Sequence, residues 1–144
     1  MATSDFTLTL TSRQTPTEVF NAVANVRNWW TGYYAEEITG NTDKIGNEFT
    51  FVAGGGVHRS TQQLVEVFPG KKIVWLVTES KLNFLEDAEE WTGTKIIFDI
   101  TEENGQTKLV FTHEGLKPQN ECYQACAPAW TQYLQNKLLP LINR

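Results

Sequence analysis

The sequence has little of what marks a secreted, membrane or nucleic-acid-binding protein. Two cysteines in 144 residues are too few for a disulfide framework. Twelve Lys and Arg residues are scattered along a chain of net charge −5, so we expect neither nucleic acid nor an anionic membrane as a partner. No apolar run approaches the ~20 residues of a membrane span, and residues 1–10 lack the charged and apolar regions of a signal peptide. We therefore expect a cytoplasmic protein.

The sequence also lacks a recognisable catalytic, metal-binding or phosphate-binding motif. Its two histidines, His58 and His113, are not spaced as metal ligands, and the pair Cys122 and Cys126 has no second pair to complete a site. No serine or cysteine lies in a nucleophile elbow. The glycines at 54–56 precede neither Lys-Ser/Thr nor a helix, so a hairpin turn is expected there. We assign no catalytic residue, metal or cofactor from these patterns.

What the chain has in quantity is aromatic side chains: five Trp, eight Phe and four Tyr. A buried aromatic removes about 150–250 Å² from water, so few of them are expected on the surface. They are densest in NWWTGYYAEE, residues 28–37. Trp30 continues an apolar helix stripe and is expected in the core. Trp29, Tyr33 and Tyr34 are expected at the mouth of a cavity, with a purely structural core as the alternative.

Hydrophobic alternation predicts a strand at 5–12, then short helices, then a run of strands. The helix should begin with a capping box formed by Thr15 and Glu18, with Pro16 in the first turn. The later strands are expected at 35–39, 48–53, 57–68, 72–79, 94–102 and 107–113. An Asn-Gly pair at 104–105 is the strongest hairpin signal.

The last two strands predict which side chains face the core. On the first of these strands, Phe98 should share the buried face with Ile96 and Ile100. On the next strand, Phe111 should share it with Leu109, and the same alternation places His113 on the buried face. The strand at 57–68 is ambiguous. The favoured phase buries Gln63, Val65 and Val67 and leaves Glu66 in solvent. The other phase turns Leu64, Glu66 and Phe68 inward.

The chain should end in a long helix whose apolar stripe runs from Cys122 to Ile142. Pro128 removes a backbone N–H, so we expect a kink there or a short helix followed by a longer one. Cys122 and Cys126 lie one turn apart and are expected to be small buried thiols, with a redox pair as the alternative.

These elements predict an α+β fold in a single domain spanning residues 1–144. A sheet with one apolar face must bury that face, and only the final helix is long enough to cover it. A curved sheet around one helix tends to leave a concave, aromatic-lined space.

Several stretches carry a family resemblance: TPTEVFNAVANVRNWW, IGNEFTF, LVEVFPGKKIVW, TKIIFDITEENGQTKLVFTHEGL and AWTQYLQNKL. In this order they cover most of the chain, which resembles the START-like superfamily, also called the helix-grip or birch-pollen-allergen fold. The chain is most similar to the branch named after the activator of heat-shock protein 90 ATPase. It departs from that branch where STQQLVEV and PAW lack a commonly found glycine.

The resemblance implies a curved antiparallel sheet of about six or seven strands wrapped round a long C-terminal helix, with two short helices after the first strand. It also implies a hydrophobic cavity but no single activity, because the superfamily includes carriers, cyclases and co-chaperone domains. Our first hypothesis is a non-enzymatic module that binds a small apolar or amphipathic ligand. The expected ligand-binding residues are Trp29, Trp30, Tyr33, Phe51, Phe98, Phe111, His113, Trp130 and Tyr133.

Alternatives remain open for several of these assignments. His113 would anchor a polar group of the ligand, or would be a buried structural histidine; in a cyclase- or hydrolase-like enzyme it would act as acid or base. His58 is expected at an exposed strand start. The acidic run at 86–90 is expected as a solvated loop, or as a contact for a chaperone partner. The sequence leaves the oligomeric state open.

Overall fold

A single antiparallel sheet forms the framework of the protein in the computed structural model, which describes residues 5–144. Its order is β1-β7-β6-β5-β4-β3-β2, so the strands from β2 to β7 form a meander and β1 adds to the edge beside β7. The strands are β1 (Phe6–Ser12), β2 (Glu37–Gly40), β3 (Glu48–Ala53), β4 (His58–Phe68), β5 (Lys72–Leu82), β6 (Lys95–Glu103) and β7 (Gln106–Glu114). Each predicted strand is therefore present, with ends shifted by a few residues.

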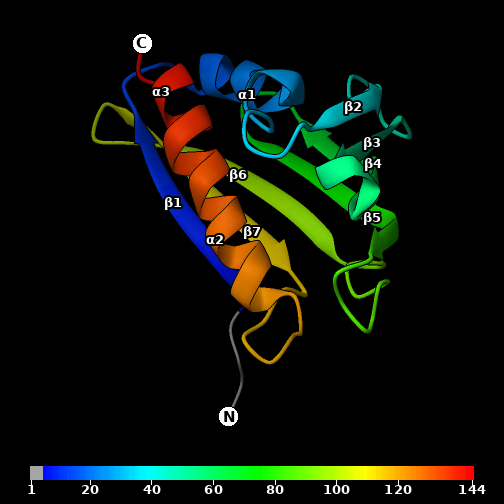
Figure 1. Ribbon diagram of the computed structural model, residues 1–144. Coiled ribbons are helices and arrows are strands. Elements are labelled where there is room, and N and C mark those ends of the chain that lie inside the picture. Colours follow the sequence, from blue (N-terminus) through cyan, green and yellow to red (C-terminus); the bar gives the residue numbers. More distant parts are fainter. Residues whose placement is uncertain (1–4) are drawn as a thin grey trace.

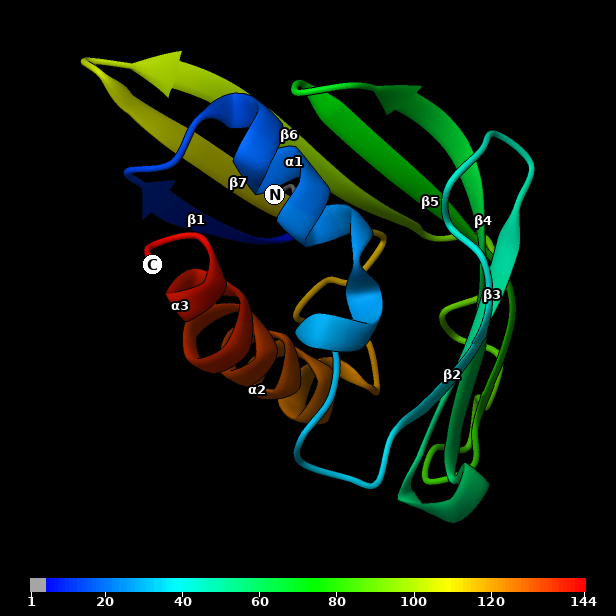
Figure 2. The ribbon, with the colours of Figure 1, turned by 90° about the horizontal axis from the view of Figure 1, so that it is seen from above.

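The helices lie on one face of this sheet. They are α1 (Pro16–Ala24), the 3-10 turns η1 (Val26–Asn28) and η2 (Gly54–Gly56), and a C-terminal helical run of α2 (Tyr123–Tyr133), η3 (Leu134–Leu138) and α3 (Leu139–Leu141). The C-terminal run lies along β1 and β7 (Figure 1), and the sheet bends round it while α1 lies over one end (Figure 2). This confirms the predicted helix-grip arrangement. Within residues 5–144, no helix combines the length and the apolar character needed to cross a bilayer.

The start of α1 follows from the capping box that the sequence predicts. Thr15 Oγ1 accepts the Glu18 backbone N–H at 3.1 Å, and Glu18 Oε1 accepts the Thr15 N–H at 3.1 Å. Val19 and Val23 are fully buried on the inner side of the helix. The helix then ends at Ala24, earlier than its apolar stripe suggests, and the chain continues in η1.

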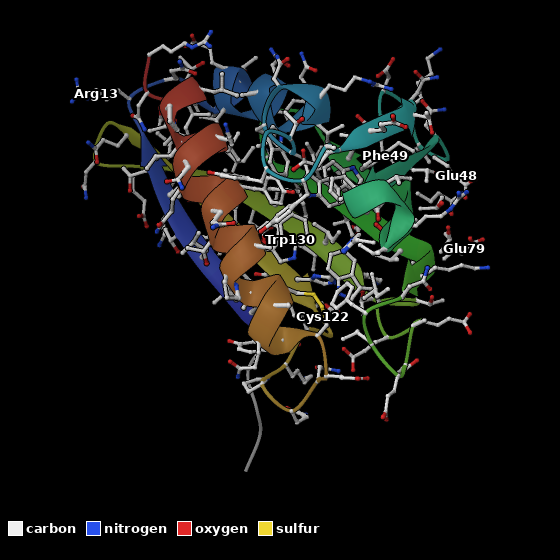
Figure 3. The ribbon with its side chains drawn as sticks, viewed as in Figure 1. Arg13, Glu48, Phe49, Glu79, Cys122 and Trp130 are labelled. Atoms are coloured by element: carbon white, nitrogen blue, oxygen red, sulfur yellow. A yellow bond between two sulfur atoms is a disulfide. The ribbon has the colours of Figure 1, made fainter. Side chains whose placement is uncertain are left out.

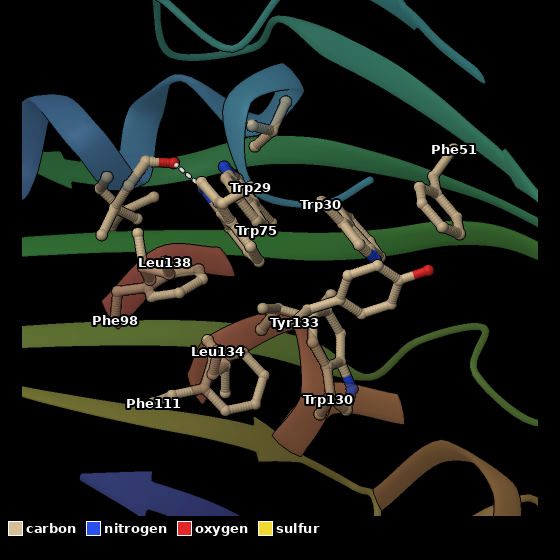
Figure 4. Packing of buried hydrophobic residues seen from close by; sticks show 14 of the residues in the cluster. Trp29, Trp30, Phe51, Trp75, Phe98, Phe111, Trp130, Tyr133, Leu134 and Leu138 are labelled. Atoms are coloured by element: carbon tan, nitrogen blue, oxygen red, sulfur yellow. Dashed lines mark hydrogen bonds between the residues drawn. The ribbon is translucent and has the colours of Figure 1, made fainter. Parts of the chain in front are cut away.

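Trp29 is fully buried and does not line the pocket described below, so its expected place at the mouth of a cavity is wrong. The early end of α1 changes the direction of the chain, and the Trp29 ring packs edge-on against Phe98 at 5.8 Å between centroids. Its indole N–H donates to the Val23 carbonyl at 3.0 Å (Figure 4). A helical extrapolation past Ala24 could not predict this position.

Bulges decide which side of β4 faces the core. Its pairing with β5 shifts in register between Thr61 and Gln62 and again between Leu64 and Glu66. Gln62 and Leu64 are buried, whereas the favoured phase placed Gln63 inward. Beyond the second bulge Glu66 is exposed and Val67 packs against the core, as that phase predicted. One phase could not hold along the strand, because a bulge inserts an extra residue.

The C-terminal helical run continues through Pro128, so the chain does not divide there into a short helix and a longer one. Pro128 is exposed, where water can solvate the carbonyl that its missing N–H leaves unpaired. The departure from α geometry comes later, in the π-helical turn η3. Cys122 and Cys126 are buried as expected. They are paired as a disulfide, as the redox alternative requires, and their Cα atoms on adjacent helical turns are 5.5 Å apart.

The capping box makes a first testable prediction. Thr15→Ala should lower the free energy of unfolding by about 1 kcal/mol, because the Glu18 N–H loses its acceptor. Urea denaturation measures the change. The matched control is Thr17→Ala, an exposed position of the same helix outside the capping box, which should change stability by less than about 0.5 kcal/mol. Equal losses in the two variants would contradict this origin of α1.

Candidate functional site

A pocket of about 260 Å³ lies between the β3–β4 side of the sheet and α2. Four parts of the chain contribute to it: the segment after η1, the end of β3 with the glycine turn and the start of β4, the loop between β5 and β6, and α2. Its lining residues are Trp30, Tyr34, Phe51, Ala53, Gly54, Val57, His58, Phe84, Trp91, Ala125, Cys126, Ala129, Trp130 and Tyr133. Most of them are apolar or aromatic, and His58 is the one ionisable group among them apart from tyrosine and the bonded cysteine.

Stacked aromatic rings form the inner wall of this pocket. Trp30 stacks on Phe51 with centroids 4.1 Å apart and lies 4.9 Å from Trp130. Trp91 stacks on Trp130 at 5.9 Å. The Trp130 side chain extends from α2 toward the sheet (Figure 3), with Tyr133 beside it (Figure 4). The sheet and the helix therefore meet through indole rings.

The pocket brings together four of the predicted residues: Trp30, Phe51, Trp130 and Tyr133. The other five are placed outside its lining: Trp29, Tyr33, Phe98, Phe111 and His113. Trp29, Phe98 and Phe111 are fully buried in the core, and exposed Tyr33 packs on the outer side of Tyr133 at 5.5 Å between centroids. Whether any of these residues binds a ligand stays a prediction.

His113 is fully buried and faces the core, as alternation predicts, but its hydrogen bonds are satisfied inside the protein. Trp130 Nε1 donates to His113 Nδ1 at 3.1 Å, so the ring proton resides on Nε2, which lies 2.9 Å from Thr94 Oγ1. Thr94 Oγ1 in turn donates to the Trp91 carbonyl at 2.6 Å. This series of hydrogen bonds links two residues that line the pocket, Trp130 and Trp91. It leaves neither ring nitrogen of His113 free for acid–base catalysis. Burial lowers the pKa of His113 to about 3.

His58 lies at the pocket rather than at an exposed strand start, which corrects that expectation. Its ring packs edge-on against Trp91 at 4.8 Å and Phe51 at 5.3 Å. Burial lowers its pKa to about 4, so the imidazole is neutral near pH 7. The β5–β6 loop causes the difference, because it folds back and places Trp91 and Phe84 beside His58.

Sequence reasoning missed the contribution of that loop to the pocket. Trp91 directly follows the acidic run 86–90, and a tryptophan next to a charged loop was the one signal available. The loop is fixed by carboxylates: Glu121 accepts the backbone N–H groups of Glu86 and Asp87, and Glu90 accepts those of Glu121 and Cys122. The loop is thus tied to the start of α2, with Glu86 and Glu89 exposed.

A second segment, residues 32–36, is fastened beside the pocket. Glu36 accepts the backbone N–H groups of Gly32 and Tyr33, and Tyr133 Oη donates to Glu36 Oε2 at 2.5 Å. The Tyr34 carbonyl accepts the Gly54 N–H at 2.8 Å. Partial burial alone would raise the pKa of Glu36, but these hydrogen bonds outweigh it and lower the pKa. Burial, with the bond to Glu36, raises the pKa of Tyr133.

Metal ligands do not gather anywhere in the described part of the chain, where no three His, Cys, Asp or Glu side chains come together as a site. The residues that line the pocket carry aromatic rings, methyl groups, tyrosine hydroxyls and the ring nitrogens of His58 and three tryptophans. Its chemistry is suited to holding an apolar molecule by contact and to orienting it by hydrogen bonds.

The buried histidines predict how stability depends on pH. Unfolded histidines take up protons below their ordinary pKa of 6.5, whereas folded His113 and His58 do so only near 3 and 4. The unfolded chain binds more protons in this window, so stability is full above pH 6.5 and falls as the pH drops toward 4, by up to about 1.4 kcal/mol per pH unit for each histidine.

Urea denaturation between pH 7 and 4.5 tests this dependence. His113→Gln, whose amide can still bond Trp130 and Thr94, should remove one histidine's share of the slope. His58→Gln should likewise remove the part of the pH dependence of stability that comes from His58. Equal pH slopes in the parent protein and in both variants would show that these histidines titrate normally.

Comparison with known proteins places this architecture in a family. The family described as activator of Hsp90 ATPase homolog 1-like protein matches residues 13–142. No curated protein sequence matches the chain.

Solved structures with the same fold cover nearly the whole chain. The Aha1 dimer from Colwellia psychrerythraea has a TM-score of 0.71 at 20% identity, covering 92% of each chain. A protein from Rhizobium loti has a TM-score of 0.73 at 20% identity, covering 97% of each chain. An HSP90 activator from Plasmodium falciparum has a TM-score of 0.61 at 19% identity, covering 92% of this chain and 91% of its own. With its sheet, its gripped helix and this match over most of its length, the chain belongs to the activator of Hsp90 ATPase homolog 1-like family.

Proposed function

We propose that the protein binds a small apolar or amphipathic molecule in the pocket between the sheet and α2. The observation that carries this proposal is a space of about 260 Å³ bordered by aromatic rings. A cavity of about 150 Å³ holds benzene, so by proportion this pocket suits a molecule of about ten non-hydrogen atoms.

The packing around the pocket supports the same function. Protein interiors are close-packed, and side chains beside a void lose contact energy. Here Trp30, Phe51 and Trp130 pack tightly on one another, yet they leave space beside them. A planar apolar molecule would restore the missing contacts on the open side of these rings.

Filling the pocket tests the proposal. Naphthalene should bind saturably and quench tryptophan fluorescence, and Ala129→Phe should weaken its binding at least tenfold, because the new ring occupies the space. Gln124→Phe is the matched control, since it adds the same ring at an exposed position of α2 outside the pocket lining. Absence of saturable binding, or equal affinity in both variants, would contradict a binding pocket.

A second candidate function is stimulation of a heat-shock protein 90 ATPase. The family description supports it, and one structure with the same fold is titled an HSP90 activator. Within the acidic run 86–90, Glu86 and Glu89 are exposed and available for a basic partner surface, whereas Glu90, like Glu121 outside the run, accepts hydrogen bonds within the protein.

A chaperone assay separates the two functions. If the surface acts on the chaperone, the protein should co-purify with a bacterial heat-shock protein 90 and raise its ATP turnover. Glu86→Lys with Glu89→Lys should reduce this effect, and Ala129→Phe should leave it unchanged because position 129 lies in the pocket lining. Unchanged ATP turnover with the parent protein would exclude this candidate.

A further inference from the structure

Several buried polar atoms have no hydrogen-bond partner, and two of them belong to residues that line the pocket. Within residues 5–144, the atoms shielded from water and unpartnered are His58 Nε2, Ser60 Oγ, both amide atoms of Gln62, Trp75 Nε1 and Trp91 Nε1. His58, Ser60 and Gln62 occupy alternating positions on β4, so their side chains share its inner face. A buried polar atom without a partner has lost its hydrogen bonds to water and gained none, so native structures rarely leave such an atom unpaired.

Two of these groups belong to the pocket itself. His58 and Trp91 both line it, and their ring centroids are 4.8 Å apart. Trp130 also lines the pocket, but it differs from Trp91 because His113 already accepts its indole N–H. Trp30 and Phe51, which also line the pocket, stack on each other. Among the lining residues, His58 and Trp91 are the two that carry a buried ring nitrogen without a partner in the described part of the chain.

The pocket lining carries no charge near neutral pH. Burial keeps His58 uncharged, and no Lys, Arg, Asp or Glu lines the pocket. An ionised group entering it would lose its hydration without gaining an opposite charge. An indole N–H can only donate, so the group that partners Trp91 must be an acceptor.

We propose that the ligand is a neutral, planar molecule of about two fused rings with one oxygen or nitrogen acceptor, which Trp91 Nε1 binds together with His58. This inference rests on the proposed function and specifies its ligand class. The apolar body lies against Trp30, Phe51 and Trp130, and the acceptor lies beside His58 and Trp91. His58 Nε2 can accept from a hydroxyl or donate to a carbonyl, according to its tautomer.

Binding of naphthalene, 2-naphthol and 2-naphthoate tests this class by calorimetry. The three probes share one ring system: naphthalene has no polar group, 2-naphthol has a neutral hydroxyl and 2-naphthoate has a carboxylate.

The quantity compared between variants is the ratio of naphthol affinity to naphthalene affinity, because a change in pocket shape affects both affinities and cancels in the ratio. In Trp91→Phe this ratio should fall about tenfold from its parent value, because the ring stays and the N–H is lost. His58→Phe should lower it similarly. Naphthoate should bind the parent at least tenfold more weakly than naphthol.

The matched control is Trp130→Phe. It removes an indole N–H that His113 already occupies, so it should change both affinities while leaving their ratio within about twofold. Indole proton NMR gives an independent readout: the Trp91 N–H resonance should move downfield with naphthol and not with naphthalene. Circular dichroism establishes that each variant is folded.

The outcomes separate this inference from the proposed function. If naphthalene and naphthol bind but neither Trp91→Phe nor His58→Phe changes the ratio of their affinities, the proposed hydrogen bonds from Trp91 and His58 to the ligand are wrong. The binding function would then still stand. Tighter binding of naphthoate than of naphthol would overturn the neutral ligand class. Absence of binding by all three probes would overturn the proposed function and this inference with it.

Discussion

The contact between Trp30 and Trp130, with ring centroids 4.9 Å apart, connects the sheet side of the molecule to its C-terminal helix. Trp30 also stacks on Phe51 of β3, and Trp130 stacks on Trp91 from the β5–β6 loop. Indole rings bridge the layers at this end of the C-terminal helical run, whereas Leu134 and Leu138 fill the core further along it. The pocket lies where this stack ends, and its shape depends on the stack.

The two histidines contact this stack in different ways. His113 accepts the Trp130 N–H and is connected to the Trp91 carbonyl through Thr94 Oγ1. His58 lies on the pocket side with an unpartnered ring nitrogen in the described part of the chain. Both are kept neutral by burial. The histidine expected as a ligand anchor thus has both ring nitrogens hydrogen-bonded within the protein, and the one expected at an exposed strand start adjoins the pocket.

Family membership and pocket chemistry give information about different features of the molecule. The family match and the neighbouring structures concern the fold as a whole, and a fold does not determine an activity. The pocket is apolar and opens to the surface beside Tyr34, Val57 and Phe84, whereas exposed carboxylates such as Glu86 and Glu89 lie on the loop that carries Trp91. A molecule in the pocket contacts Trp91, so occupancy and the position of this loop are physically connected.

The sequence by itself determined the strands, the capping box of α1, the gripped C-terminal helix and the inward direction of His113. These follow from local rules, since alternation and capping depend on neighbours within a few residues. Only the tertiary structure decided the burial of Trp29, the bulged phase of β4, the continuity of the helix at Pro128 and the meeting of His58 with Trp91. Those features depend on where α1 ends, on strand register and on a loop fastened to α2 by Glu90, and such contacts between distant residues leave no periodic pattern in the chain.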